Sequence, residues 1–200
     1  MTNDRLALQI AFTLEIDKLK GIGRQTLLAD GSRPETDAEH SWHIAIMAHL
    51  LAEHAPPGTD IGRVTAMLLV HDLVEIDAGD TFIHDEQGAL DKEAREKAAA
   101  DRLFGLLPPD QGMSFRALWE EFEAKRSNEA IFADALDRMQ PILNNFATQG
   151  GSWRAHKVTA DKVLTLVARI ERGSPALGAY TRDLVAEAVR RGYLAAAPTP

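Results

Sequence analysis

The segment from Leu68 to Asp80, LLVHDLVEIDAGD, constrains the fold more than any other stretch of the chain. It begins as an apolar run, which predicts burial, and then brings one histidine and several acids into the same helical turns. Burying such groups costs several kcal/mol unless they pair with one another or with a cation. The fold must therefore place this segment at its centre and supply partners for His71, Asp72 and Glu75 from neighbouring elements.

The rest of the chain shows the spacing of amphipathic helices, and we find no convincing strand pattern. Glycines and prolines divide these patterns, and Thr36 or Asp37 is suited to cap the second helix. The stretch between the first two helices, which contains Gly31 and Pro34, is predicted to be a connecting loop. We expect helices over residues 5–19, 38–54, 60–79, 91–107, 114–125, 128–147, 152–171 and 175–191.

The chain is predicted to be one all-α domain. Its 200 residues suffice to bury a single core, and we expect the domain to span residues 1–192, followed by a flexible C-terminal tail over residues 193–200. The sequence contains no internal repeat and no Gly-rich phosphate loop. Helical proteins of this size often pair through apolar faces, so we expect a homodimer.

Composition excludes several classes of function. The net charge of -8 repels the backbone of long nucleic acids, so none is expected as a partner. The absence of cysteine means that any metal must use nitrogen and oxygen ligands. The longest apolar run, Ala66 to Val70, is far shorter than the roughly 20 residues of a membrane span, and the start does not resemble a signal peptide. We therefore expect no membrane association and a cytoplasmic location.

Two further helices carry a titratable group on their apolar stripe. His40 lies in line with Ile44 and Met47 at helical spacing, which predicts that its side chain faces inward. Asp137 lies among apolar residues, and Pro141 removes the helical hydrogen bond to its carbonyl, a feature that sites often carry. Asp134, one turn earlier, competes with Asp137 for the role of inward acid, and spacing leaves both open.

A cation would solve the burial problem of the central segment. His40, His71, Asp72 and Asp137 would supply two imidazoles and two carboxylates from three helices, with positions left open for water and substrate. We therefore expect one divalent ion. This ligand set favours Mn, Co, Fe, Ni or Zn over Mg, which prefers oxygen ligands and retained waters.

The order of these residues resembles a known family. The pattern H…HD…D in EHSWHIAIMAHLLAEH, LLVHDLVEIDAGD and DALDRMQPIL is similar to the HD-domain metal-dependent phosphohydrolases. With LKGIGR and RPETDAEHS added, the likeness is closest to the bacterial 5'-deoxynucleotidases and to the HD domain-containing protein 2 group, and it spans roughly residues 10 to 170. The resemblance implies an HD-domain helical bundle, with the metal between core helices and His40, His71, Asp72 and Asp137 as its ligands.

The same resemblance implies roles for three other residues. Glu75 would act on the attacking water, Asp80 would lie near the substrate sugar and phosphate, and Arg24 would bind phosphate through its guanidinium fork. Asp80 is also a candidate proton donor to the leaving group. Gln25 departs from the bacterial enzymes, which carry an aromatic residue at this position. The implied activity is that of a metal-dependent phosphomonoesterase, which removes the 5'-phosphate from (deoxy)ribonucleoside monophosphates.

Two other functions remain open at this stage. The chain could be an HD hydrolase of another phosphate ester, such as a cyclic or guanosine polyphosphate nucleotide, although Ile76 stands where hydrolases of guanosine polyphosphates carry a second acid. It could also be a non-catalytic nucleotide-binding protein, in which Glu75 merely pairs with Arg24 or Arg138 and Asp80 occupies a turn. The remaining histidines are expected to be surface or packing residues: His43, His49, His54, His84 and His156.

Overall fold

The computed structural model describes residues 2–83 and 90–198, so His84 lies outside the described residues. Helices dominate this part of the chain, as predicted. The α-helices are α1 (Thr2–Ile16), α2 (Asp37–Leu50), α3 (Ile61–Val70), α4 (Glu75–Ala78), α5 (Lys92–Phe104), α6 (Pro109–Ala124), α7 (Asn128–Ala147), α8 (Gly151–Ala155), α9 (Ala160–Gly173) and α10 (Pro175–Arg190). Shorter 3-10 helices are η1 (Asp17–Gly21), η2 (Ala52–His54) and η3 (His71–Val74).

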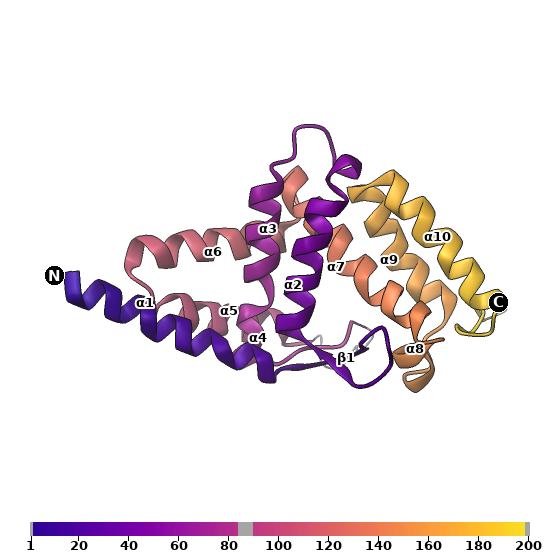
Figure 1. The fold of residues 1–200 in the computed structure, drawn as a ribbon, viewed down its shortest axis with the longest axis horizontal. Helices are drawn as coiled ribbons and strands as arrows, with labels where there is room; N and C mark the ends of the chain where they lie inside the picture. The colour runs from indigo at the N-terminus through magenta and orange to yellow at the C-terminus, as the bar shows by residue number, and fades with distance from the viewer. Residues whose placement is uncertain (1, 84–89, 199–200) are drawn as a thin grey trace.

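Helices α2, α3 and α7 occupy the middle of the molecule, with α1, α5 and α6 on one side and α8, α9 and α10 on the other (Figure 1). One core cluster joins the middle helices to α9 and α10, and a second joins α1 and η3 to α5 and α6. Met67 and Leu68 belong to the first cluster, whereas Leu73 and Val74 belong to the second. The segment from Leu68 to Asp80 is apolar on most sides because it lies between the two core clusters.

The prediction that the chain lacks strands was wrong. The stretch expected to be a loop contains an antiparallel pair, β1 (Gly23–Leu27) and β2 (Pro34–Thr36), in which Gly23 pairs with Thr36. Strands this short show too few alternations to be recognised, and an isolated pair is at best marginally stable in water. Tertiary contacts support the pair: the Asn144 amide of α7, for example, donates a 3.1 Å hydrogen bond to the carbonyl of Leu27.

The helix predicted over residues 60–79 is divided. Asp60 caps its start by accepting a hydrogen bond from the backbone of Arg63, and Gly79, with φ of 74°, ends it, as predicted. Between them, α3 ends at Val70, and η3 carries His71 and Asp72 before α4 begins at Glu75. The tighter winding of a 3-10 helix changes where consecutive side chains point, and hydrophobic periodicity does not reveal it.

Other predicted boundaries also needed correction. The second helix ends at Leu50, and η2 follows it. Helix α6 begins at Pro109 and not at residue 114. A proline is tolerated in the first turn of a helix, because the N–H that it lacks would have no partner within the helix there. The helix predicted over residues 152–171 is two helices, α8 and α9, because Lys157 adopts a positive φ of 52° between them.

Residues beyond α10 return to the body of the molecule. The side chain of Leu194 is buried, and the carbonyl of Ala195 accepts a 2.9 Å hydrogen bond from the backbone of Ala160 at the start of α9. No helix within residues 2–83 and 90–198 combines the length and the apolar character that crossing a bilayer demands.

Candidate metal centre

His40 lies one turn into α2, and the start of that helix is fixed by its cap. The Thr36 side chain accepts a hydrogen bond from the backbone N–H of Glu39, and the Glu39 carboxylate accepts one from the backbone N–H of Thr36. The two bonds together form a capping box. This start turns the next inward position toward α7. The side chain of His40 is fully buried there.

Both ring nitrogens of His40 face oxygen atoms. Nδ1 lies 3.0 Å from the amide oxygen of Gln140, and Nε2 lies 3.0 Å from Oδ1 of Asp137. The amide nitrogen of Gln140 donates to Glu35 at 2.7 Å, so the amide orientation is set and its oxygen must accept from Nδ1. A neutral His40 therefore carries its proton on Nδ1 and presents the lone pair of Nε2 to the centre.

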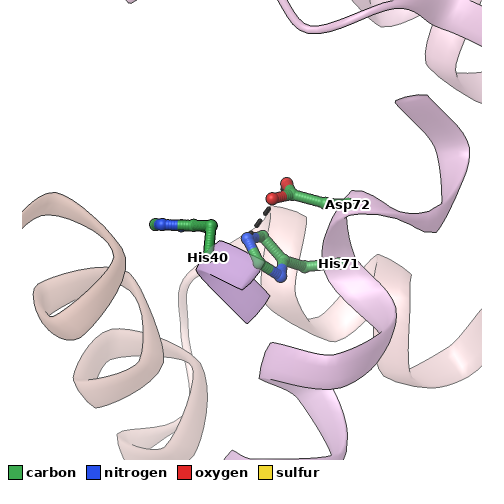
Figure 2. A group of neighbouring side chains, drawn as sticks. All are labelled: His40, His71 and Asp72. Atoms are coloured by element: carbon green, nitrogen blue, oxygen red, sulfur yellow. Dashed lines mark ion pairs between the residues drawn. The ribbon is translucent and has the colours of Figure 1, made fainter. Parts of the chain in front are cut away.

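His71 and Asp72 leave η3 side by side, and His40 comes from the neighbouring helix α2 (Figure 2). The Nδ1 atom of His71 lies 2.9 Å from the carbonyl oxygen of Leu68, an arrangement in which Nδ1 donates. Nε2 of a neutral His71 therefore also offers a lone pair. This atom approaches Oδ1 of Asp72 at 3.0 Å, yet it is buried and forms no hydrogen bond within the described part of the chain.

The structure places Asp137, rather than Asp134, beside the two histidines. Oδ1 of Asp137 lies 3.0 Å from Nε2 of His40 and 3.9 Å from Nε2 of His71. Asp134 instead forms ion pairs with Arg169 of α9 and with Arg138. The two acids, three positions apart on α7, thus have different surroundings.

These contacts provide a test of whether the residues suit a metal ion. Two imidazole lone pairs face carboxylate oxygens in a buried space, an arrangement that is repulsive unless a proton or a cation lies between them. Burial opposes a charge on His40, but the carboxylates of Asp137 and Glu35 outweigh it and raise the pKa of His40 to about 9. His40, His71 and Asp72 each offer a donor atom, and these atoms lie within 4.8 Å of one another. Mixed nitrogen and oxygen donors of this kind suit a transition-metal ion.

A pocket opens onto this cluster from solvent. His71, Asp72 and Asp137 contribute to its wall, whereas His40 lies behind them. The predicted substrate residues Arg24 and Asp80 and the predicted catalytic Glu75 line the same pocket. The structure therefore brings together all of the residues that the sequence singled out, with His40 as the most deeply buried of them.

Arg24 reaches the pocket from β1. Its Nη1 atom donates to Oδ1 of Asp37 at 3.0 Å and to Oδ2 of Asp72 at 3.1 Å. Its Nε atom is buried without a hydrogen-bond partner among the residues that the structure describes. An arginine with an unused N–H beside a pocket is suited to bind an anion.

A cluster of three acidic residues lines or borders the same pocket as the histidines. Asp37, Glu75 and Asp80 each offer an oxygen, and these oxygens lie within 4.8 Å of one another. Burial, followed by the charges of Asp72 and Asp37, raises the pKa of Glu75 well above its usual value. Burial also raises the pKa of Asp80 and, together with Asp72, that of Asp37 to about 6. Glu75 is thus a stronger base than an ordinary glutamate.

Several residues of the site were missed in the sequence. Asp37 was considered only as a helix cap, and its side chain turns out to be fully buried beside Arg24. Glu35 and Gln140 orient His40, and Lys92 and Arg138 add positive charge to the pocket wall. The sequence offered one signal for two of them, because Arg138 and Gln140 stand within the DRMQP segment that begins at Asp137.

Gln25, the position that departs from the family pattern, has an unexpected partner. Its amide oxygen lies 2.9 Å from Nε2 of His156, whose ring stacks at 4.5 Å on Phe82. Gln25 and Phe82 both line the pocket, so Gln25 places a polar amide in the wall at the position where the bacterial enzymes carry an aromatic residue. His156 therefore contacts the pocket wall, although the sequence indicated no role for it.

Comparison with known proteins agrees with this geometry. The family described as HD domain matches residues 16–178. Human 5'-deoxynucleotidase HDDC2 is 33% identical over 56% of this chain and 53% of its own length, so the match spans about half of that relative. The 5'-deoxynucleotidase of Yersinia pestis is 26% identical over 78% of this chain and 83% of its own length.

Solved structures extend the likeness to the whole fold. A predicted metal-dependent phosphohydrolase from Magnetospirillum magnetotacticum is 65% identical, with a TM-score of 0.91 over 96% of this chain and 98% of that one. A conserved hypothetical protein from Pyrococcus furiosus is 23% identical, with a TM-score of 0.62 over 90% of this chain and 99% of that one, and shares the fold. This chain therefore belongs to the HD domain family.

Proposed function

We propose that the protein hydrolyses the 5'-phosphate of (deoxy)ribonucleoside monophosphates, using one divalent ion held by His40, His71, Asp72 and Asp137. The observation that carries this proposal is that the buried Nε2 atoms of His40 and His71 each lie 3.0 Å from a carboxylate oxygen, beside the pocket that Arg24 lines. A bound ion would polarise a phosphoryl oxygen and lower the pKa of water. Mn, Co, Fe, Ni or Zn suits the nitrogen-containing donor set better than Mg.

Glu75 is proposed as the general base. Its carboxylate lines the pocket one turn from His71, so it can accept a proton from the water whose oxygen attacks phosphorus. Burial and the neighbouring acids raise the pKa of Glu75, and a divalent cation beside it would favour the carboxylate form that a general base needs.

Arg24 is proposed to bind the phosphate. Its guanidinium keeps an unused N–H beside the pocket and stays charged at every physiological pH. As the bond between phosphorus and the leaving oxygen breaks, negative charge grows on the phosphoryl oxygens, and a fixed guanidinium stabilises it. Lys92 and Arg138 line the same pocket and add to the positive potential.

Asp80 is proposed to serve the leaving group. Burial raises the pKa of its carboxyl, which keeps a proton available to a higher pH than an ordinary aspartic acid allows. That proton would pass to the sugar oxygen as its bond to phosphorus breaks, while the proton of water passes to Glu75. The same carboxyl can accept a hydrogen bond from a sugar hydroxyl.

The choice of nucleotides rests on the relatives. The human and Yersinia proteins carry the name 5'-deoxynucleotidase, and the positions of Arg24, Glu75 and Asp80 around one pocket are compatible with such a substrate. Gln25, whose amide oxygen is held by His156, adds a polar group to the pocket wall beside Phe82, and the Phe82 ring can pack against a base or sugar.

A substrate panel tests the proposal. Purified protein is stripped with a chelator, reloaded separately with Mn, Co, Ni, Zn or Mg, and assayed for phosphate release from all ribo- and deoxyribonucleoside 5'-monophosphates. Nucleoside 3'-monophosphates, cyclic nucleotides and guanosine polyphosphates serve as comparisons. We expect release from 5'-monophosphates alone and none after stripping. Turnover confined to cyclic or polyphosphate nucleotides would transfer the assignment to another HD phosphoesterase.

A further inference from the structure

We infer that Asp37 is a positioning residue that shares the guanidinium of Arg24 with Asp72 and so keeps it directed at the phosphate subsite. This inference rests on the proposed function, because it is there that Arg24 receives a phosphate. Neither the sequence pattern nor the family resemblance gave Asp37 a role beyond that of a helix cap.

The guanidinium of Arg24 is shared between two acids. Nη1 lies 3.0 Å from Oδ1 of Asp37 and 3.1 Å from Oδ2 of Asp72, so neither carboxylate holds it alone. Asp37 is fully buried, and its Oδ2 atom has no hydrogen-bond partner among the described residues. A buried carboxylate at this distance from an arginine is an effective anchor, because solvent screens the pair only weakly.

The backbone fixes the position of Asp37. Gly23, which precedes Arg24, pairs with Thr36, and the backbone N–H of Asp37 donates at 3.1 Å to the carbonyl of Ile22. The end of the small sheet therefore places Arg24 of β1 next to Asp37, which is the first residue of α2. Neither residue has to be brought to the other by a long flexible segment.

Without Asp37, Asp72 would be the one carboxylate left on Nη1 among the residues that the structure describes. Arginine prefers to meet a carboxylate with two parallel hydrogen bonds, so Arg24 would rotate onto Asp72. This movement would withdraw the guanidinium from the phosphate and neutralise an acid proposed to bind the metal. An opposing effect exists: the negative charge of Asp37 also repels a phosphate, so its removal alone would strengthen phosphate binding. The sign of the measured change distinguishes the two effects.

The experiment compares Asp37→Asn, which keeps an oxygen in place but removes the charge, with Asp37→Ala, which removes both. The matched control is Glu39→Gln, which removes a charge from the same helical turn, where Glu39 pairs with Arg33 instead. All variants are checked for unfolding temperature and studied at saturating Mn²⁺. Calorimetry measures the affinity for inorganic phosphate, and steady-state kinetics measures KM and kcat.

If Asp37 positions Arg24, phosphate affinity falls on the order of 10- to 100-fold in Asp37→Ala and by less in Asp37→Asn. The loss appears mainly in KM, because the phosphate is bound before and during reaction. Glu39→Gln keeps the phosphate affinity and the KM of the wild type. Unchanged or tighter phosphate binding in both Asp37 variants overturns the inference.

A double-mutant cycle separates this role from a general structural one. In an Arg24→Ala background, Asp37→Ala should cause no further loss in kcat/KM, since its partner is gone. Losses that multiply would show that Asp37 acts independently of Arg24. Failure of the proposed function remains distinguishable: a wild type that releases phosphate from no nucleotide, yet binds phosphate in a manner that depends on Asp37, contradicts the substrate but supports the positioning role.

Discussion

The imidazole of His40 and the carboxylate of Asp137 meet at 3.0 Å although 97 positions separate them in the chain. Their contact joins α2 to α7. The amide of Gln140, one turn beyond Asp137, fixes the other side of the same ring. The centre is therefore held from several helices at once.

Replacement of His71 by alanine should remove the metal. The variant loses a donor whose Nε2 atom has no other hydrogen-bond partner in the described chain, so we expect a metal affinity lower by more than the roughly 10- to 100-fold that an outer partner contributes. Elemental analysis after gel filtration measures the metal per chain. His49→Ala, which alters a histidine bonded to Thr65, is the control and should retain the metal. Full metal content in His71→Ala would contradict the assignment.

Gln140→Leu should weaken the metal without touching a ligand. The amide oxygen holds Nδ1 of His40 at 3.0 Å, and its loss frees the ring to rotate or to change tautomer. We expect a decrease in metal affinity of about 10- to 100-fold, measured by competition with a chelating indicator. Asn144→Ala, one turn further along α7 and bonded to the hairpin, should leave the affinity unchanged.

Substitution should show that Asp134 and Asp137, the two aspartates of α7, have different roles. Asp137→Asn removes an acid that contacts both histidines and should abolish metal retention. Asp134→Asn loses its ion pair with Arg169, so it should lower the free energy of unfolding by about 1 to 3 kcal/mol while the metal stays bound. Denaturant unfolding and metal analysis of both variants provide the comparison. The reverse pattern would assign the ligand role to Asp134.

Glu75→Gln should abolish turnover and stabilise the metal-free protein at the same time. Because the folded-state pKa of Glu75 lies above its unfolded value, the carboxylate form costs stability as the pH rises through this range. The variant should therefore unfold at a higher temperature at pH 8, and the gain should shrink as the pH falls and Glu75 itself becomes protonated.

The control for this prediction is Glu39, a glutamate whose pKa is shifted in the opposite direction. Arg33 and the backbone of Thr36 lower the pKa of Glu39 to about 2, so its charged form stabilises the fold above its unfolded pKa. Glu39→Gln should lower the unfolding temperature at pH 8 and retain turnover. A Glu75→Gln enzyme that keeps its full rate would remove Glu75 from the mechanism.

Burial and helical spacing allowed much of this site to be predicted. His40, His71 and Asp137 lie on apolar stripes, and a polar group on such a stripe must find a partner inside the fold. The spacing of Asp134 and Asp137 could not separate them, because the distinction depends on Arg169, which lies 35 positions from Asp134. Contacts of that kind are not encoded in any local pattern.

The small sheet was missed for a related reason. Strands β1 and β2 pair only a few residues, and their stability depends on α7 and on the capped start of α2. Asp37 could be read as a helix cap in the sequence, since aspartate favours that position. Its actual neighbour, Arg24, is brought to it by the sheet, so a missed strand pair meant a missed contact.

The hairpin and the helices contribute different parts of the pocket. Arg24 and Gln25 belong to β1, whereas the histidines and acids of the buried centre belong to α2, η3 and α7. Under the proposed function, substitutions within the five residues of β1 would alter which phosphate ester is accepted without changing the proposed metal ligands. Such a division would let the substrate of this pocket change while the buried donor atoms stay the same.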